Sequence, residues 1–102
     1  MNGGKDSKAP LGLLPEKPCF EIVEVLQWAA DQGKYGLYDW REGRSWMGEV
    51  DAILRHIFLF KAGVDLDPES GMPHLAHALC RLMVLMEYQE THPEFDDRYK
   101  KP

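Results

Sequence analysis

The hydrophobic residues of the chain gather in three segments, residues 18–33, 46–62 and 73–91. None of them alternates apolar and polar positions with the period of two that a β-strand requires. The first segment opens with Pro18, which suits a first helical turn because its missing N–H would have no partner there. Ser45 stands immediately before the second segment and can cap a helix. A glycine or a proline stands at or just beyond the end of each segment. The pattern therefore predicts three α-helices.

Short connections join these predicted helices, which is typical of an antiparallel helical bundle, so we expect an all-α fold. The third helix is apolar nearly all round at residues 82–86, Leu-Met-Val-Leu-Met. A helix without a polar face is either central in the fold or covered by a partner chain. At 102 residues the chain has room for one modest core and buries only about 60–65% of its unfolded surface. We therefore expect self-association, as a homodimer or a higher homo-oligomer, to complete the bundle.

The segments outside the helices are more polar. Residues 1–17 are rich in Gly, Lys, Asp and Pro and are expected to form a flexible N-terminal arm, whose apolar patch at 11–14 docks onto the helical body. Residues 18–102 are expected to form a single helical domain. The polar C-terminal tail of this domain, residues 94–99, is expected to wrap back onto the body.

The charge of the chain limits its partners. It has 12 basic and 17 acidic residues, a net charge of −5 and no basic run, which argues against binding to a nucleic acid polymer. An anionic nucleotide could still bind if a metal ion bridged the like charges.

No apolar run approaches the roughly 20 residues of a membrane-spanning helix. Residues 1–8 also lack a hydrophobic signal core, so we expect no membrane partner and a cytoplasmic location. Cys19 and Cys80 lie among apolar neighbours and are expected to be small core residues in a reducing compartment.

An acidic loop, residues 65–71, leads directly into the third predicted helix. Three carboxylates fall within five of its residues, and His74 and His77 follow on one helical face. A His-x-x-His pair can direct two imidazoles toward one metal ion or one phosphate group. Each histidine could equally be a satisfied, half-buried residue. Asp67, which precedes a proline, also has a structural use in a turn, so it carries less weight than Asp65 as a ligand.

The first two predicted helices carry further charged residues. Glu21 and Glu24 are three residues apart and share a face. That face is either a solvated acidic surface or a pair that needs a cation, because two carboxylates among apolar neighbours repel each other. Arg55, on the second helix, is spaced for an ordinary ion pair one turn away but could instead reach a phosphate. His56 lies seven residues after Glu49 and aligns with it, facing either water or the site.

The loop between the first and second helices is dense in aromatic and basic residues. Lys34, Tyr35 and Trp40 lie in it, and Trp46 follows. Aromatic faces stack on nucleobases and basic groups meet phosphates, a role also open to Arg81 on the third helix. The alternative is that the aromatic rings close the open end of a small bundle. The chain contains neither a G-x-G-x-x-G nor a Walker A phosphate loop, and neither a serine elbow nor an H-E-x-x-H zinc motif.

Several short motifs, taken together, resemble one family. They are Lys34-Tyr35-Gly36, Asp39-Trp40, Leu54-Arg55-His56, the run from Asp65 to Ala78, and the run from His92 to Arg98. In order and spacing they resemble the phage and prophage family known as the dATP/dGTP diphosphohydrolase N-terminal domain, over about residues 11–99.

The resemblance implies an all-helical protein related to the MazG-like nucleotide pyrophosphohydrolases, working in the cytoplasm of a bacterial host. Such enzymes hold Mg²⁺ or Mn²⁺ with a Glu-x-x-Glu pair on one helix and Glu-x-x-Asp on a later one. They cleave a nucleoside triphosphate between its α and β phosphates. Glu21 and Glu24 match the first pair, whereas His74 and His77 stand where Glu-x-x-Asp would be expected. Because Mg²⁺ prefers oxygen ligands, either the acidic loop supplies them or the site binds nucleotide without turning it over.

The leading hypothesis is therefore a phage-type, metal-dependent diphosphohydrolase that cleaves a purine dNTP to dNMP and pyrophosphate with Mg or Mn as cofactor. The candidate catalytic residues are Glu21, Glu24, Glu69 and His77. The candidate metal ligands are Glu21, Glu24, Asp65, Glu69, His74 and His77. The candidate nucleotide-binding residues are Lys34, Tyr35, Trp40, Trp46, Arg55, His56 and Arg81. The alternative hypothesis is a non-catalytic protein that sequesters a host-defence signalling nucleotide. A structural interaction module, inert toward all nucleotides, is the third.

Overall fold

A computed structural model describes residues 8–33 and 36–100 of the chain. The α-helices are α2 (Glu16–Asp31), α3 (Trp46–Lys61) and α4 (His74–Thr91), and the short 3-10 helices are η1 (Leu11–Leu13), η2 (Asp39–Glu42) and η3 (Pro93–Phe95). The described ranges contain no β-strand, and Leu66 and Pro73 form an isolated antiparallel bridge. The all-α prediction is confirmed.

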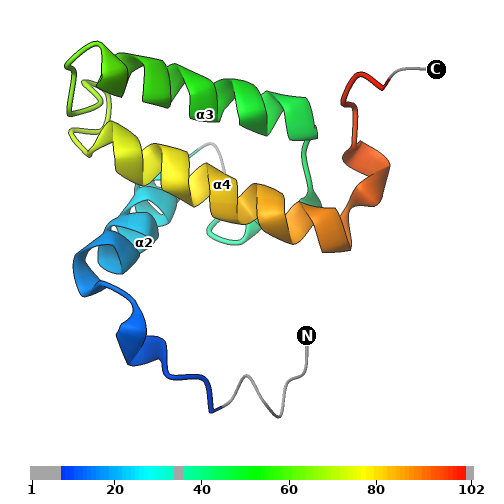
Figure 1. Ribbon diagram of the computed structural model, residues 1–102, viewed down its shortest axis with the longest axis horizontal. Helices are drawn as coiled ribbons and strands as arrows, with labels where there is room; N and C mark the ends of the chain where they lie inside the picture. Colours follow the sequence, from blue (N-terminus) through cyan, green and yellow to red (C-terminus); the bar gives the residue numbers. More distant parts are fainter. Residues whose placement is uncertain (1–7, 34–35, 101–102) are drawn as a thin grey trace.

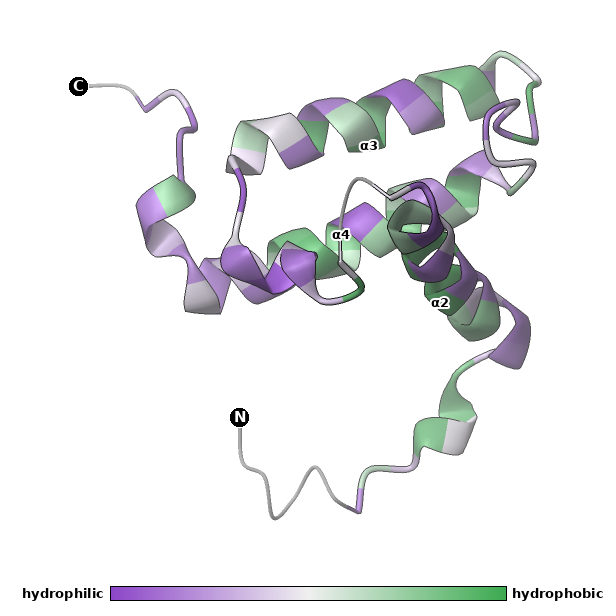
Figure 2. Cartoon of the chain, turned by 180° about the vertical axis from the view of Figure 1, so that it is seen from behind, coloured by the Kyte–Doolittle hydropathy of each residue, from purple (hydrophilic) through white to green (hydrophobic). Residues whose placement is uncertain are grey.

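Helix α4 is the central element of the molecule. It runs antiparallel to α3, and the two lie side by side along most of their lengths (Figure 1). Helix α2 packs across α4 and has almost no contact with α3. The fold is therefore an antiparallel α3–α4 hairpin with α2 crossing one of its members, as both views show (Figures 1 and 2). None of the helices in the described residues is long and apolar enough to span a bilayer.

The helix ends follow the local sequence signals. Helix α2 begins at Glu16, two residues before the predicted start, and still accommodates Pro18 in its first turn, where N–H groups lack partners. Helix α3 begins directly after Ser45, whose Oγ accepts a hydrogen bond from the Gly48 N–H at 3.0 Å. Gly63 follows α3 with a φ of +96°, a left-handed conformation that favours glycine.

Two small clusters make up the core. One joins α2 to α4 through Val25, Ala76 and Cys80. The other joins α3 to α4 through Trp46, Val84 and Tyr88, and Trp40 and Leu85 pack against it. The fully buried Tyr88 also donates its hydroxyl proton to the carbonyl of Trp40, which ties the η2 segment to α4. Both cysteines are free; Cys80 is buried, and Cys19 is half-buried on α2.

The C-terminal tail returns to the start of α3, as predicted. Asp97 accepts hydrogen bonds from the Ser45 hydroxyl and, at 2.9 Å, from the Met47 N–H. A carboxylate at a helix N-terminus is stabilised by the unpaired N–H groups and by the helix dipole. The Arg98 guanidinium lies 5.0 Å from the centre of the Trp46 ring. The tail therefore covers the end of α3 that the core leaves open.

The apolar patch of the N-terminal arm does not dock. Leu11, Leu13 and Leu14 are 71%, 83% and 53% exposed, so the expected contact with the helical body is wrong for these residues. The flexibility predicted for residues 1–7 concerns residues outside the described ranges.

Helix α4 also carries exposed apolar side chains. They are Leu82, Met83 and Met86, whereas Val84 between them is buried. A partner that covers these side chains remains a prediction.

Candidate functional site

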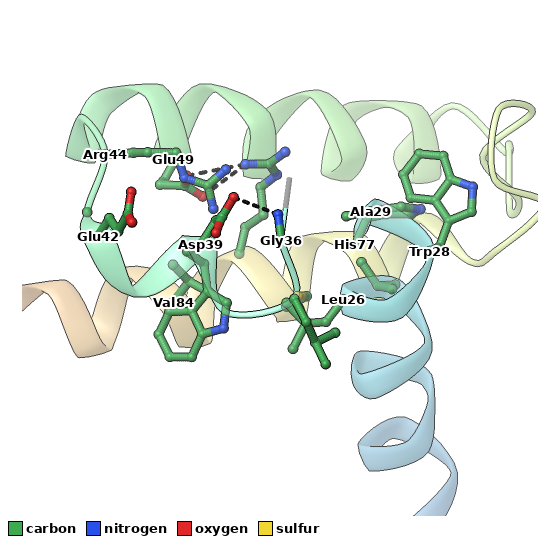
Figure 3. A pocket seen from close by; sticks show the side chains of 16 residues that line it. Leu26, Trp28, Ala29, Gly36, Asp39, Glu42, Arg44, Glu49, His77 and Val84 are labelled. Atoms are coloured by element: carbon green, nitrogen blue, oxygen red, sulfur yellow. Dashed lines mark hydrogen bonds and ion pairs between the residues drawn. The ribbon is translucent and has the colours of Figure 1, made fainter. Parts of the chain in front are cut away.

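A cavity of about 250 Å³ lies where the C-terminal half of α2, the segment 36–44 and the middle of α4 meet (Figure 3). It is lined by Val25, Leu26, Trp28, Ala29, Gly36, Leu37, Asp39, Trp40, Glu42, Gly43, Arg44, Glu49, His77, Cys80, Arg81 and Val84. An apolar pocket with a few charged groups converging on it is the usual form of a small-molecule site.

Two indole rings contribute most of the aromatic surface of the cavity. Trp28 projects from α2, and its ring meets that of His77 edge to face, with 5.6 Å between the centroids and an interplanar angle of 86°. Trp40 comes from η2 and is partly buried against the Trp46 cluster. The Arg41 guanidinium lies over the Trp40 ring, 4.4 Å from its centroid. Aromatic faces at such positions can hold a flat, apolar ring system by stacking.

A buried carboxylate and two guanidinium groups form the charged part of the wall. Glu49, on α3, is only 2% exposed. Arg81, on α4, contacts both of its carboxylate oxygens through Nη1, at 3.3 and 3.1 Å. Arg44, just before α3, contacts Oε1 through Nε at 3.3 Å, and the same Nε lies 3.5 Å from the Tyr88 hydroxyl. Figure 3 shows Glu49 and Arg44 meeting at one end of the lining residues, with Trp28 at the other.

Two further carboxylates line the cavity. Asp39 accepts a hydrogen bond from the Gly36 N–H at 2.6 Å and so closes the turn between α2 and η2. Glu42 lies at the end of η2, next to Gly43. Three carboxylates, including Glu49, thus face two guanidinium groups. An anion that enters the cavity meets strong local positive charge at the arginines but an overall excess of one negative charge.

Three imidazoles cluster between α3 and α4, beside the cavity. His56 Nδ1 lies 2.8 Å from His74 Nδ1, so one ring donates a hydrogen bond to the other. The His56 ring also stacks on His77, with centroids 4.8 Å apart and planes 8° from parallel. His74 Nε2 is buried and finds no hydrogen-bond partner within the part of the chain that the structure describes.

The acidic loop reaches the cavity through His77. The His77 Nε2 atom is 2.7 Å from the Ser70 hydroxyl oxygen and 3.4 Å from Asp67 Oδ2. Ser70 in turn donates to Asp67 at 3.0 Å and accepts the Met72 N–H at 3.1 Å. The turn-forming use of Asp67 is therefore real, and the same carboxylate also borders the histidine that lines the cavity.

Burial favours the neutral form of two of these rings, His56 and His77. Desolvation, followed by the nearby charges of His77 and His74, lowers the pKa of His56 to about 4. Burial also lowers the pKa of His77, although the neighbouring Asp67 acts in the opposite sense. At Asp67 partial burial opposes ionisation. The hydrogen bonds from the Ser70 hydroxyl and the Glu69 N–H outweigh it, so the pKa of Asp67 is lowered.

The expected metal ligands are not brought together. Glu21 is half-buried and Glu24 exposed on α2, and neither lines the cavity. Asp65 and Glu69 are exposed in the acidic loop. Across residues 8–33 and 36–100, no three His, Cys, Asp or Glu side chains are arranged so as to hold a metal ion. As they lie, these residues do not fit a divalent metal, and their role as ligands remains a prediction.

The expected nucleotide-binding residues divide into several groups. Trp40 and Arg81 line the cavity. Trp46 is a core residue, 6% exposed, with its Nε1 donating to the His92 carbonyl at 3.1 Å, so the structure leaves no face of its ring for a base. Arg55 is exposed on α3 and does not line the cavity, and His56 belongs to the adjoining histidine cluster. Lys34 and Tyr35 lie outside the described residues.

Comparison with known proteins identifies the family. The family model described as "dATP/dGTP diphosphohydrolase, N-terminal" matches residues 2–98. The chain belongs to this family. A protein of Salmonella phage PMBT28 named dATP/dGTP diphosphohydrolase is 35% identical to the chain over 91 residues. That match covers 89% of the chain but 30% of the relative, so the chain spans less than a third of the relative's length. No solved structure matches the chain significantly.

Several residues at the candidate site of this dATP/dGTP diphosphohydrolase N-terminal domain were not predicted as site residues, Asp39 and Glu42 among them. Trp28, Arg44 and Glu49 line the cavity, and Ser70 bonds to His77. The only sequence signal for Glu49 was its helical alignment with His56, which left open whether it faced water or the site. Trp28 lies one helical turn after Glu24, and no pattern in the sequence indicates that its side chain faces the segment of η2. Arg44 stood in a polar stretch without a motif, and Ser70 lay in the acidic loop, where the charged residues drew the attention.

Proposed function

We propose that the cavity binds a purine deoxynucleoside triphosphate and that the chain takes part in its hydrolysis to the monophosphate and pyrophosphate. The observation that carries the proposal is the pairing, in one cavity, of indole rings at Trp28 and Trp40 with the guanidinium groups of Arg44 and Arg81. Membership of the dATP/dGTP diphosphohydrolase N-terminal family and the name of the phage relative support the choice of substrate.

The cavity suits the two ends of a nucleotide differently. Its volume of about 250 Å³ is slightly below the roughly 300–1,000 Å³ of typical ligand pockets, so it would hold the base and only part of the triphosphate. The base would stack near Trp28, and the phosphates would lie at the arginine end. Guanidinium groups match phosphate oxygens in charge and in geometry, and they would stabilise the charge that develops on departing pyrophosphate.

His77 is our candidate for handling a proton. It lines the cavity, and its lowered pKa keeps the ring neutral and able to accept a proton from water at pH 7. Ser70 and Asp67 fix the orientation of the ring through Nε2. A variant His77→Gln would remove the acceptor, and we expect a fall in turnover of about 10²-fold or more.

Dependence on Mg²⁺ or Mn²⁺ is part of the proposal. Its support is the charge of the wall, in which Asp39, Glu42 and Glu49 outnumber Arg44 and Arg81. A triphosphate would add to this negative excess unless a divalent cation accompanied it. When bound, such a cation polarises phosphoryl oxygens and lowers the pKa of a coordinated water. The family pattern names Glu21 and Glu24 as protein ligands, but neither lines the cavity, so we propose that the cation enters with the phosphates of the nucleotide.

Turnover of individual nucleotides tests the function. The purified chain is incubated with each of the four dNTPs in EDTA, Mg²⁺ or Mn²⁺, and pyrophosphate and dNMP are quantified. We expect release from dATP and dGTP in the metal-containing samples and little from the pyrimidine nucleotides. The variant Glu90→Gln, at an exposed position of α4, serves as a control that should keep full activity. Absence of pyrophosphate from every nucleotide would exclude catalysis by this chain alone.

A second candidate function is binding without turnover. It is favoured by the lack of a metal-holding group among the described residues. In this case the protein would sequester a nucleotide, such as a host-defence signal. Affinity would then be unaffected by EDTA, and denaturation would release the nucleotide intact. Recovery of monophosphate alone would exclude it.

We also propose that the chain forms a homodimer or a higher homo-oligomer. An apolar groove of about 380 Å³ between α2 and α4 is lined by Ile22, Leu26, Trp40, Cys80, Met83, Val84, Met86 and Glu87. Two of the lining side chains, Met83 and Met86, are exposed on α4, and hydrophobic stretches on α2 and α4 are visible in Figure 2. A second copy would cover them by the hydrophobic effect, which favours burial of contiguous apolar surface.

A further inference from the structure

The buried Glu49 carboxylate pairs with two arginines, whereas a purely structural ion pair would require only one. A carboxylate that is 2% exposed needs a cationic partner, because burying an isolated charge is strongly unfavourable. One guanidinium would satisfy that need. Glu49 has two, Arg44 from the loop before α3 and Arg81 from α4, and the group therefore carries a net charge of +1.

The contacts place Glu49 on the inner side of both guanidinium groups. The carboxylate is buried, whereas the side chains of Arg44 and Arg81 are 39% and 38% exposed and both line the cavity. Arg81 uses Nη1 alone for its two contacts with Glu49. A guanidinium has five N–H donors in a planar fork, so Arg81, which lines the cavity, keeps donors that Glu49 does not use.

We infer that Glu49 is a positioning residue that orients Arg81, together with Arg44, to bind the phosphate groups of the ligand. The inference rests on the proposed nucleotide function for the identity of the ligand, and on the geometry for the role of Glu49. A guanidinium held in advance loses little conformational freedom on binding, which increases affinity for a phosphate. Trp28 lies at the opposite end of the lining residues (Figure 3). The same arrangement would therefore set the orientation of the bound nucleotide, with its phosphates at the arginines.

Binding of three probes to the full chain separates this role from a structural one. The probes are dATP, inorganic tripolyphosphate and deoxyadenosine, each measured by isothermal titration calorimetry. In Glu49→Gln, which keeps the shape but removes the charge, we expect dATP and tripolyphosphate to bind about tenfold more weakly or worse. Deoxyadenosine, which lacks phosphates, should bind as to the unmodified chain. Glu90→Gln is the matched control and should bind all three probes normally.

Arg81→Lys covers the case in which Glu49→Gln fails to fold. Lysine keeps a positive partner for Glu49 but lacks the planar fork. We expect this variant to keep the melting temperature of the unmodified chain while its affinity for tripolyphosphate falls by about tenfold. Equal weakening of dATP and deoxyadenosine in Glu49→Gln would overturn the positioning role. So would unchanged or increased affinity for tripolyphosphate in a folded Glu49→Gln variant.

The same titrations distinguish failure of the inference from failure of the proposed function. If the unmodified chain binds tripolyphosphate but neither dATP nor deoxyadenosine, the nucleotide function fails and the role of Glu49 toward phosphates is still decided by the two variants. If the chain binds dATP and neither variant weakens it, the inference alone fails. If the chain binds none of the three probes, both are overturned.

Discussion

The packing of two histidines, His56 and His77, makes stability depend on pH. Their rings stack on each other, and a proton on either one places a positive charge beside the other ring and near Arg81. Asp67 is the nearest compensating charge. In the unfolded chain each ring would be solvated and take up a proton at its ordinary pKa.

We therefore expect the free energy of unfolding to fall as the solution is acidified from pH 7.5 to 4.5. The folded-state pKa of His56, about 4, lies below its unfolded value of 6.5, so between these values the unfolded state binds more protons. Stability then rises with pH across this window and is fully present above 6.5. The slope for one proton approaches about 1.4 kcal/mol per pH unit. Urea denaturation at several pH values measures it, and His56→Gln should flatten the curve. A free energy independent of pH in this window would contradict the prediction.

Stacking on Trp28 is testable at a single position. Its ring lines the cavity next to His77, and replacement by alanine would remove an aromatic face worth about 1–3 kcal/mol for a stacked base. We expect Trp28→Ala to weaken binding of both dATP and deoxyadenosine, in contrast to Glu49→Gln. Trp28→Phe keeps an aromatic face, so its affinity should lie between those of the unmodified chain and Trp28→Ala. Calorimetry gives the values, and equal affinities in all three proteins would show that the ring does not contact the base.

At the scale of the elements, the helices were predictable because their signals are local. Ser45 and the glycine at 63 mark the ends of α3 within a few residues of where they act. The start of α2 was misplaced by two residues because proline is tolerated throughout a first turn. Such signals involve neighbours in the sequence and do not depend on the rest of the fold.

The site was only partly predictable because its contacts join distant segments. Arg81 and Glu49 are 32 positions apart, and nothing in either sequence neighbourhood encodes that they meet. Trp40 and Trp46 looked alike in the sequence, yet Trp40 lines the cavity and Trp46 is buried beneath the tail. Which aromatic residue of a loop faces a ligand depends on how the loop packs, and that is a tertiary property.

The contact between tail and helix start gives a prediction for α3. The Ser45 hydroxyl accepts the Gly48 N–H and donates to Asp97, so one side chain both caps the helix and holds the tail. Ser45→Ala should lower the free energy of unfolding by about 0.5–2 kcal/mol, the usual range for losing an N-cap. Chemical denaturation followed by circular dichroism measures the change. Asp51→Ala, at an exposed position within α3, is the control and should stay within about 0.5 kcal/mol. If the two variants are equally stable, the cap contributes nothing.

At the scale of the whole molecule, the core is small for the apolar surface that surrounds it. Eight hydrophobic residues of the described ranges are buried, whereas large apolar side chains are exposed on α2, α3 and α4. A domain of about 100 residues buries a smaller fraction of its surface than a larger domain does. Covering the exposed apolar side chains would therefore add to its stability. Covering α4 would also order the groove whose wall includes Trp40, a residue shared with the candidate site.

Self-association is therefore expected to depend on the exposed methionines of α4. Met83 and Met86 both line the groove and are exposed, so a charge placed at either would have to be buried when a second copy packs there. Analytical ultracentrifugation of the unmodified chain should give a mass of at least two copies, and Met83→Glu with Met86→Glu should shift it to one. Leu13→Glu, at an exposed apolar position of the arm, is the matched control and should leave the mass unchanged. A single-copy mass for the unmodified chain at every concentration would exclude self-association through α4.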